Sequence, residues 1–197
     1  MLGEHPSDLL GRRRRFKPAR HAATPNTRAH VDVEDVSKEP GPGFPARLAL
    51  ESENLGTDIF LAKLNSQGVP VWAKAFGDAA EQLAPRVAVD AQGNVLLGCS
   101  GNGQIDFGGG ALVSAGGPTG GSDAFIAKLR GNDGSHVWST RFGDTHIQGI
   151  TSIASAGSDE IVFTASFDGT VNFGGSDFTN VGPQDVALVR YATPHAN

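Results

Sequence analysis

A tandem repeat of about 66 residues constrains the fold of this 197-residue chain more than any other feature of its sequence. Residues 71–110 placed on residues 137–176 give twelve identities in forty positions without a gap, including a tryptophan and a Phe-Gly-Asp triplet. Upstream, DIFLAKL of residues 58–64 matches DAFIAKL of residues 123–129 at five of seven positions, and a looser copy, DVALVRY, covers residues 185–191. A matched order of apolar runs and turns predicts a structural repeat.

The composition of the repeat predicts β-strands. Short β-branched or aromatic runs alternate with Gly, Asp and Asn clusters from residue 56 onward, which is an all-β pattern. Residues 123–129 are apolar on both faces, which predicts a strand between two sheets. In contrast, Trp138, Thr140 and Phe142 share one face of a half-buried strand.

We therefore expect an antiparallel four-stranded unit with an inserted β-hairpin. Its strands are predicted at residues 87–90, 95–100, 123–129 and 136–143, and the hairpin within residues 103–121. The preceding unit begins at its third strand and the following unit ends after its third. The three units should therefore have about two, four and three strands.

Residues 1–45 differ from the repeat region of residues 46–197. The first thirty residues carry seven Lys or Arg against two acids, although the whole chain has a net charge of -5. This segment has no apolar periodicity, and PGPGFP at residues 40–45 disfavours both helix and strand. We expect a disordered basic arm and linker. No apolar run is long enough for a membrane span, and no apolar segment typical of a secretory signal follows the early arginines.

The order of motifs resembles a known repeat family. VAVD-x-x-GN-V at residues 87–95 is followed by DFGGG at 106–110, SDAFIAKL at 122–129 and W-x-x-x-FGD at 138–144. This order resembles the bacterial seven-bladed β-propeller (SBBP-type) repeats of surface and secreted proteins, over about residues 56–191. The resemblance implies blade-like sheets and an extracellular or cell-envelope location, and it implies no reaction. We expect an incomplete β-propeller of about two blades.

Two blades cannot close a ring, since propellers have about four to eight. The open strand edges of such a unit template further pairing, so self-association is expected. Three interpretations follow: a truncated or mispredicted gene fragment, a protomer that completes its ring by oligomerising, or a compact β-sandwich made by the blades folding on each other. The basic N-terminus, which is unrelated to the repeat, favours the first.

The repeated polar and aromatic residues have two interpretations each. Asp78 and Asp144 of the Phe-Gly-Asp triplets suit either a Ca²⁺ site or a corner turn, and the lack of a Ca²⁺-loop pattern favours the turn. Trp72 and Trp138 suit either a sugar-binding platform or the core, and their recurrence beside a phenylalanine favours the core.

Other candidate ligands find less support in the sequence. Lys63, Lys128 and Arg190 recur at one position of the repeat, which favours paired or snorkelling structural side chains over ligand contacts. His136 and His146 lack the spacing and the repeated partner of a metal pair.

Nucleophile and phosphate-binding motifs are missing. GCSGNG around Cys99 does not fit a nucleophile elbow, so a buried inert thiol is expected. The glycine clusters at 108–110 and 120–121 lack the lysine of a phosphate loop. Arg12–Arg15, Lys17 and Arg20 are expected to form a solvated tail and not a nucleic-acid site.

The sequence thus favours a non-catalytic structural or interaction module, with no catalytic residue, cofactor or metal assigned. Its loops would bind protein or carbohydrate. The alternative is a carbohydrate-binding propeller or a propeller enzyme of the lyase or hydrolase type, with a channel lined by Asp90.

Overall fold

The computed structural model describes residues 29–30, 57–157 and 160–192, which contain strands and turns and no helix. The all-β prediction is therefore confirmed. None of these residues belongs to a helix that could cross a membrane. The strands are β1 (Ala29–His30), β2 (Ile59–Leu64), β3 (Pro70–Phe76), β4 (Gln82–Val89), β5 (Val95–Gly101), β6 (Gln104–Asp106), β7 (Ala111–Val113), β8 (Asp123–Leu129), β9 (His136–Phe142), β10 (Gln148–Ser155), β11 (Glu160–Phe167), β12 (Thr170–Asn172), β13 (Asp177–Thr179) and β14 (Asp185–Ala192).

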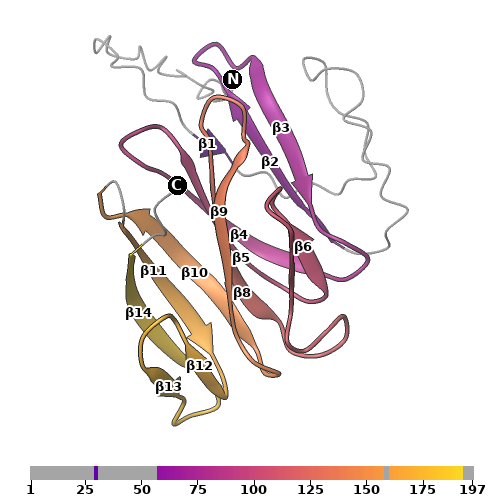
Figure 1. The fold of residues 1–197 in the computed structure, drawn as a ribbon, viewed down its shortest axis with the longest axis vertical. Coiled ribbons are helices and arrows are strands. Elements are labelled where there is room, and N and C mark those ends of the chain that lie inside the picture. The colour runs from indigo at the N-terminus through magenta and orange to yellow at the C-terminus, as the bar shows by residue number, and fades with distance from the viewer. Residues whose placement is uncertain (1–28, 31–56, 158–159, 193–197) are drawn as a thin grey trace, which may run out of the picture.

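Three antiparallel sheets follow one another in chain order, and none closes on itself (Figure 1). We call them the first sheet (β1-β2-β3), the central sheet (β4-β5-β8-β9) and the last sheet (β10-β11-β14). Two small hairpins are inserted between neighbouring strands: β6–β7 between β5 and β8 of the central sheet, and β12–β13 between β11 and β14 of the last sheet. The predicted four-stranded unit is the central sheet, and its first strand starts five residues earlier than expected, at Gln82.

The first sheet has one strand more than predicted. β1 pairs with β2 through Ala29 opposite Lys63 and His30 opposite Ala62. In the central sheet, β5 has the equivalent place beside β8, and Leu96 of β5 is opposite Lys128. An unpaired strand edge offers free N–H and C=O groups, which explains why this short segment is held there. The rest of residues 1–45 lies outside the described residues, so the disorder expected of that segment stays a prediction.

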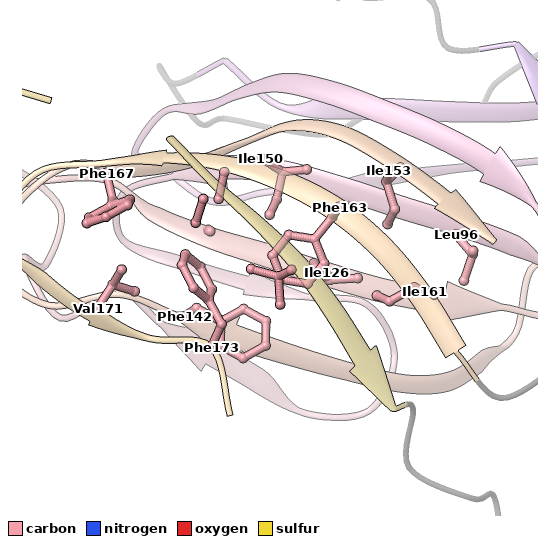
Figure 2. Close-up of a cluster of buried hydrophobic side chains, with 14 of the residues drawn as sticks. Leu96, Ile126, Phe142, Ile150, Ile153, Ile161, Phe163, Phe167, Val171 and Phe173 are labelled. Atoms are coloured by element: carbon pink, nitrogen blue, oxygen red, sulfur yellow. The ribbon is translucent and has the colours of Figure 1, made fainter. Parts of the chain in front are cut away.

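The core lies in two layers, one on each side of the central sheet. Between the first and central sheets, Leu61 packs with Leu97 and Phe125. Between the central and last sheets, Ile126 and Phe142 pack with Ile150, Phe163 and Phe173 (Figure 2).

Strand β8 is buried along its whole length. Phe125, Ala127 and Leu129 face one core layer, and Ala124 and Ile126 face the other. This confirms that residues 123–129 form a strand between two sheets, because successive side chains point to opposite faces.

Candidate functional site

The chain passes from each sheet to the next through a Phe-Gly-Asp corner. At the first corner, Asp78 Oδ1 accepts hydrogen bonds from the Ala80 N–H at 2.8 Å and Gln82 Nε2 at 3.0 Å. Its Oδ2 accepts from the main-chain N–H of Gln104 at 2.8 Å, at the start of β6. Burial by itself raises the pKa of Asp78, but these hydrogen bonds outweigh it and lower the pKa.

The second corner repeats this arrangement. Asp144 Oδ1 accepts from the His146 N–H and from Gln148 Nε2, both at 2.8 Å. Asp144 Oδ2 accepts from the Thr170 N–H at 3.3 Å, at the start of β12. Both carboxylates therefore hold a corner turn and anchor the following hairpin, as the turn interpretation predicts.

Each corner contains a buried glutamine that the sequence analysis did not single out. Gln82 Nε2 also donates to the main-chain oxygen of Asn102, and Gln148 Nε2 donates to that of Asp168, both at 3.0 Å. Both glutamines are almost fully buried. Their signal was present in the repeat, since they are identical at the same offset as the triplets.

The glycine of the triplet is required by close approach. A Cβ added to Gly143 would lie 2.5 Å from Asp123 Oδ1 and 2.6 Å from Gln148 Oε1. At the first corner, a Cβ on Gly77 would lie 2.5 Å from Gln82 Oε1 and closer still to Asp58 Oδ1. Any side chain would displace these buried oxygens.

A further aspartate recurs at the start of three equivalent strands: Asp58 directly precedes β2, and Asp123 and Asp185 are the first residues of β8 and β14. Asp123 is fully buried, and its Oδ2 accepts from the Ala115 N–H at 2.9 Å and from Arg141 of β9. Its Oδ1 has no hydrogen-bond partner among the described residues. Burial raises the pKa of Asp123, against the lowering effect of Arg141.

The three basic residues at one repeat position all have partners. Lys63 Nζ donates to the main-chain oxygen of Gly131, Lys128 Nζ lies 2.8 Å from Asp90 Oδ2, and Arg190 pairs with Glu160 at 2.5 Å. These contacts agree with the paired structural side chains that we predicted.

Asp90, the residue of the alternative enzyme channel, caps a hairpin turn. Its Oδ1 accepts from the N–H groups of Gln92 and Asn94, at 2.9 and 2.8 Å. Burial raises the pKa of Asp90, but Lys128 and Asn94 outweigh it, so the pKa is lowered. Both carboxylate oxygens of Asp90 are therefore engaged, Oδ1 by the hairpin turn and Oδ2 by Lys128.

The two tryptophans lie in equivalent core positions. Trp72 packs against the core layer between the first and central sheets, and its Nε1 donates to the Gly131 oxygen at 3.2 Å. Trp138 is buried in the other layer. Their positions agree with core packing and not with an exposed platform.

The two histidines have separate partners. His136 Nε2 lies 3.0 Å from Ser139 Oγ, and His146 Nδ1 lies 3.1 Å from Asp144 Oδ1. In the described part of the chain, no cluster of three His, Cys, Asp or Glu side chains could hold a metal. Cys99 is buried in β5, and burial raises the pKa of its thiol. The arginines of the basic arm lie outside the described residues.

No protein-family model matches the chain, and no curated protein matches it significantly.

Two hollows of the described surface lie along β14. One, of about 410 Å³, is lined by Phe167, Phe178 and Asp185 together with Leu188. Another, of about 500 Å³, is lined by Phe173, Phe178, Leu188 and Tyr191 among others. Both hollows lie on the side of β14 that corresponds to the β9 side of β8. In the central sheet, β9 pairs with β8 on that side.

Proposed function

We propose that this chain is a non-catalytic interaction module built from β-propeller-type repeats, of the kind found in bacterial surface or secreted proteins. The observation that carries the proposal is an exposed apolar face on β14. Leu188 is 74% exposed and Val186 68%, whereas the equivalent residues of β8, Ile126 and Ala124, are fully buried.

The equivalence of β14 and β8 indicates what the exposed face of β14 would bind. The last sheet covers Ile126 and Ala124 of the central sheet, because the two sheets stack with their faces together. Val186 and Leu188 offer the same face of the last sheet to a further sheet of the same kind. Covering one leucine side chain contributes about 1.5–3 kcal/mol.

The partner is a sheet of this repeat, and a second copy of the chain supplies one. The Phe-Gly-Asp corners support a structural module, since the polar groups that recur there are engaged in turn and anchoring contacts. Self-association through this face is therefore the measurable activity.

Light scattering over a range of protein concentrations tests the proposal. The mass of the wild type should rise above that of the 20.4 kDa monomer, and Leu188→Lys should shift this rise to at least about tenfold higher concentration, as expected for the loss of about 1.4 kcal/mol or more.

Val113→Lys is the matched control, because Val113 is 57% exposed on β7 and lies away from the proposed face. A wild type that stays monomeric, or equal effects of the two substitutions, would refute the proposal.

A further inference from the structure

The outer edge of β14 has no strand beside it in the described part of the chain. The last sheet ends at β14, whereas in the central sheet the equivalent β8 is followed by β9. That pairing places Ala124 opposite Phe142, and Phe125 opposite Arg141. An edge of this kind presents main-chain donors and acceptors that can pair with an added strand.

The hollow of about 410 Å³ lies along β14, where a strand equivalent to β9 would run. Phe178 of β13 lines it and is 42% exposed. Leu112 of β7 is the residue equivalent to Phe178. Leu112 is opposite Ile105 in one small hairpin, and Phe178 is opposite Val171 in the other. In the central sheet β7 contacts β9, so the small hairpin and the fourth strand cover one another there.

Asp185 lines the same hollow and corresponds to Asp123. Asp185 Oδ2 accepts from the Val181 N–H at 2.9 Å, as Asp123 Oδ2 accepts from the Ala115 N–H at 2.9 Å. In the central sheet, Arg141 of β9 pairs with the Asp123 carboxylate. Among the described residues, no basic side chain pairs with Asp185.

We propose that the β14 edge binds an extended segment of a separate polypeptide as an antiparallel fourth strand, with an arginine of that segment paired to Asp185. The sequence of β9 from Ser139 to Phe142 is Ser-Thr-Arg-Phe. We therefore expect the partner segment to contain a small residue, then any residue, then an arginine and an aromatic residue. The inference rests on the proposed function, but it uses the main-chain edge of β14 and the Asp185 carboxylate, next to the outer-face residue Leu188.

A second copy of this chain does not meet the requirement. Its β9 is already paired with β8, and its β3 with β2, so either strand would first have to leave its own sheet. Moreover, β3 carries Ala75 where β9 carries Arg141, since Ala75 and Arg141 precede the phenylalanines of the two triplets. The separate segment therefore fits the site better than a copy of the chain.

Fluorescence anisotropy with the full chain and a labelled peptide of residues 136–144 tests the site. The peptide should bind saturably, and a peptide with glutamate in place of Arg141 should bind at least about tenfold more weakly, because charge-assisted hydrogen bonds are the strong ones. In the Asp185→Arg variant the preference should reverse in favour of the glutamate peptide.

Two further variants keep the test independent of folding. Asp185→Asn keeps an oxygen for the Val181 N–H and should weaken only the binding of the arginine peptide. Glu81→Arg is the charge control, since Glu81 is exposed in the loop before β4 and does not line the hollow. It should leave both peptides unaffected.

Hydrogen exchange locates the bound peptide. The peptide should protect amides of residues 185–192 and leave those of β10 unchanged. The inference is overturned by absent binding, by equal affinity of the two peptides, by protection outside β14, or by competition between the peptide and self-association, which would make a second copy the occupant. Asp185→Asn separates the two proposals, because loss of the preference for the arginine peptide with unchanged self-association removes the edge contact and keeps the face contact.

Discussion

The side-chain amide of Gln148 donates a hydrogen bond to Asp144 Oδ1 at 2.8 Å, inside the corner between the central and last sheets. Gln82 makes the same contact with Asp78 at 3.0 Å, one repeat earlier. In both corners the glutamine also reaches the main chain after the second strand of the next sheet. One buried amide thus joins the end of one sheet to the turn of the next.

Replacing Gln148 by leucine should destabilise the protein strongly. The substitution removes donors to Asp144 Oδ1 and to the Asp168 oxygen, and buried groups left unpaired cost about 1–3 kcal/mol each. We expect the free energy of unfolding to fall by about 2–4 kcal/mol in urea titrations.

Gln104→Leu is the control, because Gln104 is exposed on β6. Its effect should stay within about 0.5 kcal/mol. Equal costs at the two positions would mean that the buried amide does not hold the corner.

Acid should remove the stabilisation that Asp144 supplies. Burial raises the pKa of Asp144, but hydrogen bonds from His146, Gln148 and Thr170 bring it below its ordinary value of 3.8. A lowered folded-state pKa stabilises the protein above the unfolded-state value, and this contribution is lost as pH falls through the folded-state pKa. The stability difference between wild type and Asp144→Asn should therefore shrink on titration from neutral pH to below 3.8.

Asp123→Asn gives the opposite sign in the same titration. Because burial raises the pKa of Asp123, its contribution is fully present below 3.8 and is lost as pH rises through the folded-state pKa. Relative to wild type, this variant should gain stability with rising pH. Parallel curves for the two variants would contradict both assignments.

The contact between the central and last sheets depends on Gly98. A Cβ at this position of β5 would lie 2.8 Å from Ile150 Cγ2 on β10. Gly98→Ala should therefore cost about 1–3 kcal/mol of stability through overpacking.

A double-mutant cycle identifies the cause. Ile150→Ala is destabilising by itself because Ile150 is buried, but in its presence Gly98→Ala should cost much less. Additive costs in chemical denaturation would show that the steric contact is not responsible.

The bulge in β4 holds Ala84 in a left-handed conformation, with φ of 53°. The left-handed conformation costs a non-glycine residue about 1–2 kcal/mol, and glycine avoids this cost. Part of the benefit is cancelled, because glycine loses more conformational entropy on folding. We expect Ala84→Gly to stabilise the protein by about 0.5 kcal/mol in thermal or urea unfolding. Ala88→Gly, in the regular part of the same strand, should destabilise it, and a loss of stability at position 84 would contradict the argument.

The sequence predicts the strands better than it predicts their partners. The alternation of Trp138, Thr140 and Phe142 and the two apolar faces of residues 123–129 are local, so the structure agrees with both. Gln82 and Gln148 look like ordinary polar residues until the fold brings a main-chain oxygen twenty residues away beside each of them. The pairing of β1 with β2 is likewise invisible in a basic, proline-rich segment, because edge pairing uses main-chain groups that every sequence possesses.

The sequence by itself determined the repeat, the strands and the Phe-Gly-Asp turns, since these follow from periodicity and from the conformational preferences of single residues. Only the tertiary structure decided that β1 joins the first sheet, that the three sheets stack face to face through two core layers, and that Asp78 and Asp144 anchor hairpins. The physical reason is that side-chain alternation fixes which face of a strand is buried, whereas stacking and edge pairing depend on segments far apart in the chain.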